Sequence, residues 1–230
     1  MFRFKQFAIE QERTPMKVGT DGVLLGAWAS VAPHAARILD IGTGTGVIAL
    51  MLAQRAPRAR ITGIDIGDVA EARANADASP WADRVEMIRC PVQEFRPAER
   101  FDLIVSNPPY FVDSLRSPDA GRALARHASE LPFAALHDAA VRLLAPGGRF
   151  CLVLPVAETA LFDAVCRGLW PVRRTEVRST PRRGVRRVLT EYVAVPAPAP
   201  RPDTLTIGTG AHEEFTEEYR ALTRDFYLKF

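Results

Sequence analysis

The chain has 230 residues, of which 47% are hydrophobic and 25% are charged, and its formal net charge is +3. This composition is typical of a folded globular protein and argues against intrinsic disorder. The length allows one large α/β domain, which needs neither a disulfide nor a metal ion to complete its core.

The cysteines and the apolar segments limit where the protein can act. Cys90, Cys151 and Cys166 are odd in number and no two have metal-ligand spacing, so we expect no metal site and a reducing compartment. The N-terminal residues lack the apolar core of a signal peptide. The longest apolar run, residues 23–32, is too short to cross a bilayer. We therefore expect a cytoplasmic protein without a membrane partner.

The predicted elements alternate between strand and helix along most of the chain. Strands are expected over residues 38–40, 61–65, 85–89, 101–106, 150–154, 172–179 and 188–195. Helices are expected over residues 47–55, 68–78, 131–144 and 158–169, and near the C-terminus at Phe215, Tyr219, Leu222 and Phe226. Such alternation predicts an α/β fold with a doubly wound, mostly parallel sheet and helices on both faces.

A glycine-rich turn, Asp40-Ile41-Gly42-Thr43-Gly44-Thr45-Gly46, joins the first of these strands to its helix. Glycines allow positive φ and a close approach of the backbone to a ligand, and the helix N-terminus favours electronegative groups. The GxGxG spacing differs from the dinucleotide pattern GxGxxG. Asp40 would repel a pyrophosphate but attract the cationic groups of S-adenosylmethionine, and Asp65 could bind its ribose hydroxyls. The pattern predicts S-adenosylmethionine binding; the alternative is a tight turn without a ligand.

The segment Ser106-Asn107-Pro108-Pro109-Tyr110 follows a strand at the sheet edge where ligands bind in such folds. The Asn107 side-chain oxygen and the Pro108 carbonyl could accept both N–H bonds of an exocyclic base amine. The nitrogen lone pair would then be free to attack a sulfonium methyl group, without a strong general base. Tyr110 could stack on the extruded base. We predict catalytic roles for these three residues; the alternative is a proline turn closed by a core tyrosine.

An arginine-rich segment covers residues 173–187, where Glu176 is the only acid. Such a concentration favours a surface that binds phosphates. The alternative is a solvated face, because the chain has only three lysines and uses arginine throughout. If the ligand is RNA, the expected contacts are Lys5, Arg173, Arg174, Arg178, Arg182, Arg183, Arg186 and Arg187.

Taken together, the motifs resemble the amino-methyltransferase branch of the Rossmann-like methyltransferases. Within that branch, the chain resembles the bacterial tRNA (adenine-N6) methyltransferases that modify the adenosine 3′ to the anticodon of valine tRNA. The resemblance implies a seven-stranded sheet with one antiparallel final strand, in one globular unit that acts as a monomer. Residues 1–36 would form a lid and substrate segment, and residues 37–230 the methyltransferase domain. The resemblance rests on Phe4-Lys5-Gln6-Phe7, residues 16–28, the glycine turn, residues 79–82 and 106–110, and the terminal Tyr219, Leu222, Thr223, Phe226, Tyr227 and Leu228.

The resemblance also implies which residues contact the cofactor. In relatives the stretch matching residues 16–28 forms a lid, which would place Lys17, Thr20, Asp21 and Gly22 beside the methionine moiety. One departure concerns Pro91, which stands where relatives carry an acid that contacts the adenine N6, so a nearby backbone group must substitute or affinity falls. The other expected contacts are Asp40, Gly42, Gly44, Gly46, Asp65, Ile66, Val92 and Asn107.

Three other functions share these motifs. A protein glutamine methyltransferase uses the same Asn-Pro-Pro-Tyr chemistry, but it resembles a longer protein with a helical domain before the core, for which residues 1–36 are too few. Methylation of guanine N2 or cytosine N4 in ribosomal RNA fits the tetrapeptide equally well. An inactive RNA-binding scaffold would explain Pro91, but not the retention of both the glycine turn and the tetrapeptide.

Overall fold

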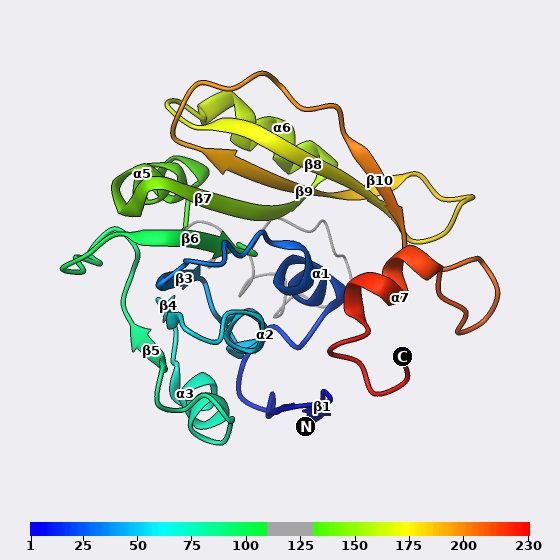
Figure 1. The fold of residues 1–230 in the computed structure, drawn as a ribbon, viewed down its shortest axis with the longest axis horizontal. Helices are drawn as coiled ribbons and strands as arrows, with labels where there is room; N and C mark the ends of the chain where they lie inside the picture. The colour runs from blue at the N-terminus through cyan, green and yellow to red at the C-terminus, as the bar shows by residue number, and fades with distance from the viewer. Residues whose placement is uncertain (110–130) are drawn as a thin grey trace.

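The computed structural model describes residues 1–109 and 131–230, and its central feature is one large sheet (Figure 1). Within the described residues, the sheet has eight strands in the order β10-β8-β9-β7-β6-β3-β4-β5. Their bounds are β3 Arg37–Ile41, β4 Arg60–Asp65, β5 Val85–Arg89, β6 Phe101–Ser106, β7 Leu144–Pro155, β8 Trp170–Arg178, β9 Val185–Val193 and β10 Asp203–Thr206. A small antiparallel pair, β1 (Phe2–Arg3) and β2 (Ala8–Ile9), stands apart from it.

The directions of the strands confirm the expected fold class. Strands β3 to β7 pair in parallel, β9 is antiparallel to both of its neighbours, and β10 is parallel to β8. The sheet has one strand more than the expected seven, and the antiparallel strand is not the final one. The additional strand β10 has only four residues and follows a proline-rich stretch, so its sequence carries no strand signal.

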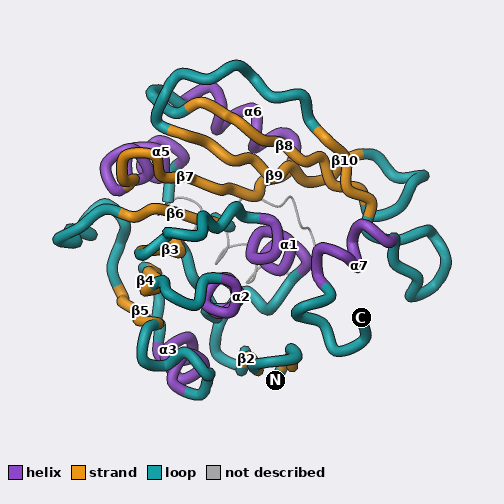
Figure 2. The backbone as a smooth tube through the Cα atoms, viewed as in Figure 1, coloured by secondary structure: helices purple, strands orange, loops and turns teal. Residues whose placement is uncertain are grey.

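Helices cover both faces of the sheet (Figure 2). One face carries α1, α2 and α3, and the other carries α5 and α6. Side chains along each strand alternate between the two hydrophobic clusters: Ile38 faces the first and Leu39 the second. The helix bounds are α1 Thr20–Trp28, α2 Val47–Arg55, α3 Ala70–Asp77, α5 Phe133–Leu143, α6 Val156–Val165 and α7 Glu217–Thr223.

The expected C-terminal helix docks on this core. Tyr219 and Phe226 are both buried in the cluster that contains α1 and α2. The Lys5 ammonium group donates to the carbonyls of Arg224 and Phe230, at 2.6 and 2.7 Å. Lys5 therefore fastens the C-terminal segment to the N-terminal one, and its expected contact with RNA stays a prediction.

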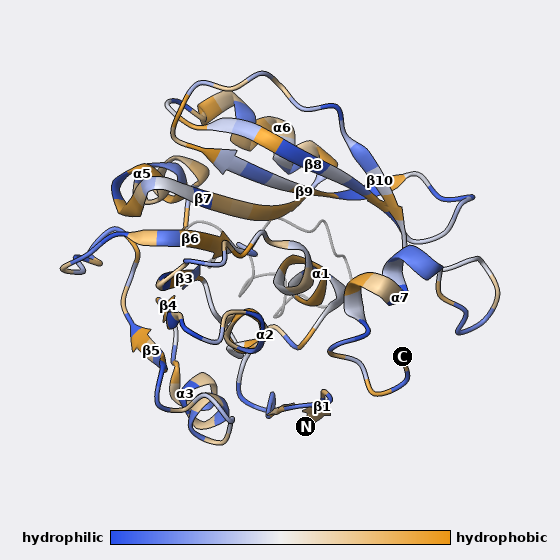
Figure 3. Cartoon of the chain, in the orientation of Figure 1, coloured by the Kyte–Doolittle hydropathy of each residue, from blue (hydrophilic) through white to orange (hydrophobic). Residues whose placement is uncertain are grey.

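Helix α1 occupies much of the segment that the sequence assigns to a lid. Its Leu24 and Leu25 are fully buried, and the helix packs against α2. Hydrophobic residues are also concentrated on β6 and β7, whereas the outer strands β8 and β9 carry hydrophilic residues among the apolar ones (Figure 3). Most of residues 20–28 are thus part of the same core as the sheet.

The spacing between α1 and α2 generates a stability prediction. A Cβ atom added at Gly26 would lie 3.0 Å from the Met51 Cβ, whereas one added at Gly22 would lie 3.5 Å from Val47 Cγ1. We expect Gly26→Ala to lower the free energy of unfolding by about 1–2 kcal/mol, because overpacking outweighs the helix propensity gained. Gly22→Ala in the same helix should leave it unchanged or raise it by up to about 1 kcal/mol. Denaturant unfolding that gives the two variants equal stability would contradict this packing.

Candidate cofactor and catalytic site

A cavity of about 330 Å³ lies at the carboxyl edge of the sheet, within the range of ligand-binding pockets. The ends of β3, β4, β5 and β6 contribute to it, and one further wall comes from the N-terminal segment 13–16. Parallel strands place ligands at this edge in open α/β sheets. The described lining residues are Arg13, Thr14, Pro15, Met16, Ile41, Gly42, Gly44, Ile64, Asp65, Ile66, Gly67, Asp68, Glu71, Cys90, Pro91, Val92, Gln93, Asn107, Pro109 and Leu131.

The glycine turn is fixed against β4 by its own backbone. The N–H groups of Gly42 and Thr43 both donate to the Ile64 carbonyl, at 2.9 and 3.0 Å, and that of Gly44 donates to the Asp65 carboxylate at 3.0 Å. Gly42 and Gly44 have φ of +75° and +54° and line the cavity. Gly46 does not line it; its φ of +83° starts α2, and an added Cβ would lie 3.0 Å from Met87 Cε.

Asp65 lies at the end of β4 and lines the cavity beside Ile66, as expected. One of its carboxylate oxygens accepts from the N–H of Gly44 and the other from that of Gly67, at 3.0 and 2.9 Å. Each oxygen keeps a further lone pair that can accept a bond from a ligand hydroxyl. Asp65 can therefore bind a ribose while it holds the loops on both sides of itself.

Asp40 has a different place from the one expected. Its side chain is fully buried and accepts a hydrogen bond of 2.7 Å from the Thr43 hydroxyl. Burial raises the pKa of this carboxyl to about 7. Asp40 lies beneath the glycine turn, does not line the cavity and supports the turn through Thr43, while its other carboxylate oxygen is buried without a hydrogen-bond partner among the described residues. Its expected contact with the cofactor stays a prediction.

The clearest indication of a ligand contact is at Asn107. Its side-chain oxygen is buried and has no hydrogen-bond partner among the described residues, although Asn107 and Pro109 line the cavity. Leaving a buried amide oxygen unpaired costs about 1–3 kcal/mol, so its position indicates an acceptor for a bound donor. Ser106 donates to the Ile41 carbonyl at 2.8 Å and thereby fixes this end of β6 to β3. Pro108 is buried beside it, and Tyr110 lies outside the described residues.

The lid residues differ most from expectation. The Lys17 ammonium group donates to the carbonyls of Gln11 and Glu12, so it closes its own loop and does not line the cavity. Thr20 and Gly22 belong to α1, away from the lining, and the carboxylate of Asp21 pairs with Arg187 at 2.7 Å. In this structure residues 13–16, and not these four residues, line the cavity.

The opposite end of the cavity follows β5. Val92 lines it, as expected, next to Pro91 and Gln93. The carbonyls of Val92 and Phe95 accept hydrogen bonds of 2.9 and 2.7 Å from Arg142 of α5. Sequence reasoning missed Arg142, because its partners lie some fifty positions away along the chain. These two bonds fix a turn whose backbone can stand in for the acid that Pro91 replaces.

The arginine-rich segment divides into two groups. Arg173 stacks on Trp28, with its guanidinium carbon 4.1 Å from the ring centre, and Arg174 forms an ion pair of 2.6 Å with Asp163. Together with Arg187, these side chains hold the protein's own structure. Arg178 is half-buried at the end of β8, whereas Arg182, Arg183 and Arg186 are exposed at or beside the turn between β8 and β9.

Two other features of the described residues bear on function. No helix among them is long and apolar enough to cross a membrane. In the same residues, no group of three or more histidine, cysteine, aspartate or glutamate side chains could hold a metal ion.

Comparison with known proteins identifies similar chains. A family model described as the methyltransferase small domain matches residues 21–158. A protein from Flavobacterium johnsoniae is 42% identical over the whole of both chains, and one from Phocaeicola vulgatus is 46% identical over 99% of this chain and 97% of its own. Both are named tRNA1(Val) (adenine(37)-N6)-methyltransferase. The crystal structure of a predicted O-methyltransferase from Agrobacterium tumefaciens has the same fold, with a TM-score of 0.69, 22% identity and coverage of 90% and 96%.

The ribose role of Asp65 generates a prediction for binding. We expect Asp65→Ala to weaken the binding of S-adenosylmethionine by about 1–3 kcal/mol, because ligand hydroxyls lose a charged acceptor. Isothermal titration calorimetry measures this directly. Asp65→Asn should weaken binding as well, since its amide NH₂ group would face the N–H of Gly44 or Gly67 and only one acceptor oxygen remains. Equal affinity of Asp65→Ala and the unmodified protein would exclude the ribose contact.

Proposed function

We propose, since this chain belongs to the family of the tRNA1(Val) (adenine(37)-N6)-methyltransferases, that it methylates N6 of the adenosine 3′ to the anticodon of a valine tRNA. Its methyl donor is S-adenosylmethionine. The full-length identity to these relatives supports the assignment, and the cavity supplies the chemistry. The free cysteines agree with a cytoplasmic site of action, where we expect a monomer.

The observation that carries the proposal is the unpaired oxygen of Asn107 at the cavity wall. An exocyclic amine offers N–H donors, and its lone pair is delocalised into the base until those bonds are accepted. Acceptance by Asn107, together with the Pro108 carbonyl, localises the lone pair on nitrogen. The chain needs no strong base for this, because orientation and hydrogen bonding supply most of the effect. Tyr110 would stack on the base that leaves the RNA.

The residues of the cavity fit the cofactor. S-adenosylmethionine supplies an electrophilic methyl group on a sulfonium centre. Asp65 would bind its ribose, the turn at Val92 its adenine, and Gly42 and Gly44 allow its close approach to the backbone. The methionine end would then lie between the cavity wall formed by residues 13–16 and the side formed by Asn107.

The exposed arginines lie at the edge of the sheet from which an RNA substrate could reach the cavity. Strand β9 begins beside the end of β7, since Arg187 pairs with Pro155, and β7 is parallel to β6. The turn between β8 and β9 therefore lies at the same carboxyl edge as Asn107. Its arginines Arg182, Arg183 and Arg186 would bind phosphates while the target base enters the cavity.

The direct test combines the protein, S-adenosylmethionine and a transcript of the valine tRNA. We expect N6-methyladenosine at the position 3′ to the anticodon, identified by mass mapping of nuclease fragments. Asn107→Ala should lower kcat by about 100-fold or more, with tRNA affinity nearly unchanged, because its hydrogen bond acts in the transition state. Methylation of a guanine, a cytosine or a protein glutamine instead would overturn the proposal.

The arginine turn is tested by charge reversal. Replacing Arg182, Arg183 and Arg186 with glutamate should weaken tRNA binding strongly. The slope of log affinity against log salt concentration should fall by the equivalent of up to about three phosphate contacts. Calorimetric affinity for S-adenosylmethionine should not change, because none of these residues lines the cavity. Arg100→Glu, an exposed arginine just before β6 at the opposite edge, is the control. Normal tRNA binding by the triple variant would show that these arginines form a solvated face and do not bind tRNA.

A further inference from the structure

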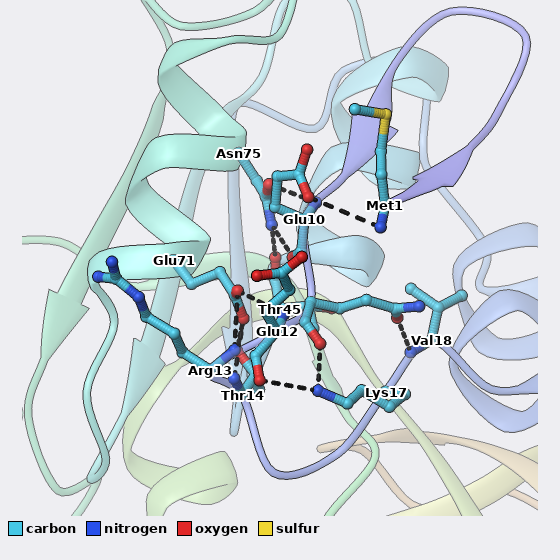
Figure 4. Close-up of polar contacts among 11 residues, drawn as sticks. Met1, Glu10, Glu12, Arg13, Thr14, Lys17, Val18, Thr45, Glu71 and Asn75 are labelled. Atoms are coloured by element: carbon cyan, nitrogen blue, oxygen red, sulfur yellow. Dashed lines mark hydrogen bonds and ion pairs between the residues drawn. The ribbon is translucent and has the colours of Figure 1, made fainter.

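One carboxylate that lines the cavity, but was not among the expected site residues, has an unusual set of partners. Glu71, in the first turn of α3, accepts hydrogen bonds from the backbone N–H groups of Glu12, Arg13 and Thr14 at 2.7, 3.0 and 2.8 Å. It also accepts one of 2.5 Å from the Thr14 hydroxyl. Figure 4 shows these donors converging on Glu71 from a single stretch of chain. That stretch, residues 10–18, is called the strap below.

The strap is closed on itself and has no secondary structure to support it. The Val18 N–H donates to the Gln11 side-chain oxygen at 2.7 Å, and Lys17 donates to two carbonyls of the same loop (Figure 4). These bonds fix the shape of the strap but not its position on the domain. Glu71 contacts three consecutive residues of it and thereby holds this part of the strap against α3.

Asn75 lies one turn further along α3 and ties the strap to the glycine turn. Its side chain accepts from the Glu10 N–H at 2.8 Å and donates to the Glu10 carbonyl at 2.9 Å. It also donates to the Thr45 carbonyl at 2.9 Å. The helix thus holds both walls of the cavity: the strap through Glu71 and Asn75, and the glycine turn through Asn75.

Glu71 is suited to this work because it stays ionised. Partial burial tends to raise the pKa of its carboxyl, but the bonds from Arg13, Thr14 and Glu12 outweigh that effect and lower the pKa to about 2. A charged acceptor bonds backbone N–H groups more strongly than a neutral one. A glutamine at this position would direct its amide NH₂ group toward some of the same N–H groups. Both are donors, so they cannot form a hydrogen bond with each other.

We propose that Glu71 is a positioning residue for the methyl donor: it holds Arg13 to Met16 as the wall that closes the cavity over bound S-adenosylmethionine. The inference rests on the proposed function, because it assigns that cofactor to the cavity. Glu71 does not touch the reacting atoms. Its loss therefore weakens cofactor binding and leaves the chemical step intact once the site is filled.

The test compares Glu71→Gln with Asp77→Asn, a carboxylate-to-amide change at an exposed position of the same helix. In Glu71→Gln, KM for S-adenosylmethionine and Kd for S-adenosylhomocysteine should rise about 10-fold, with kcat at saturating cofactor unchanged, as when uniform binding is lost. Asp77→Asn should match the unmodified protein. Thr14→Val removes one bond to Glu71 from the other side and should raise KM by a smaller factor, with kcat again unchanged.

The outcomes separate this inference from the function on which it rests. If the unmodified protein binds S-adenosylhomocysteine and Glu71→Gln binds it equally well, the positioning role is wrong and the proposed function stands. A fall in kcat in both variants, with KM unchanged, also overturns the positioning role. If the unmodified protein itself does not bind S-adenosylhomocysteine, the proposed function fails and the inference fails with it.

Discussion

Three consecutive N–H groups of the glycine turn, from Gly42 to Gly44, bond to the end of β4, and the rest of the site depends on this contact. A turn with positive φ leaves its backbone donors pointing away from its own helix, so they need acceptors elsewhere. The Ile64 carbonyl and the Asp65 carboxylate provide them. The same bonds hold the glycine turn beside Asp65 at the cavity wall. Helix α3 also bonds to this turn, through Asn75 and the Thr45 carbonyl, and it holds the strap through Glu71 and Asn75.

The topology brings the cavity and the exposed arginines to one edge of the sheet. Parallel strands β3 to β7 end there, and the hairpin of β8 and β9 turns there because β9 runs against β7. Under the proposed function, a tRNA would bind the arginine turn from outside while one extruded base reaches Asn107. The division among the arginines follows from their surroundings: Arg173, Arg174 and Arg187 have acidic or aromatic partners, whereas Arg182, Arg183 and Arg186 are exposed.

Much of the fold could be predicted from local patterns, and half of the expected cofactor-binding residues line the cavity: Gly42, Gly44, Asp65, Ile66, Val92 and Asn107. Helix α2 and strands β5 and β6 have the predicted bounds, because their periodicity is strong and their ends are marked by glycine or proline. Lys17 and Asp21 could not be placed in this way, since their partners depend on tertiary contacts; Arg187 lies 166 positions from Asp21. Glu71 has the sequence signature of an ordinary exposed acid near a helix start.

A crystal structure of the protein with S-adenosylhomocysteine is the decisive measurement, because one cavity should align the methyl donor with Asn107. We expect the ribose hydroxyls on Asp65, the adenine beside Val92 and the sulfur facing the Asn107 side-chain oxygen, beneath residues 13–16. A ligand bound outside this cavity, or within it but with its sulfur directed away from Asn107, would show that the cavity does not align the methyl donor with Asn107.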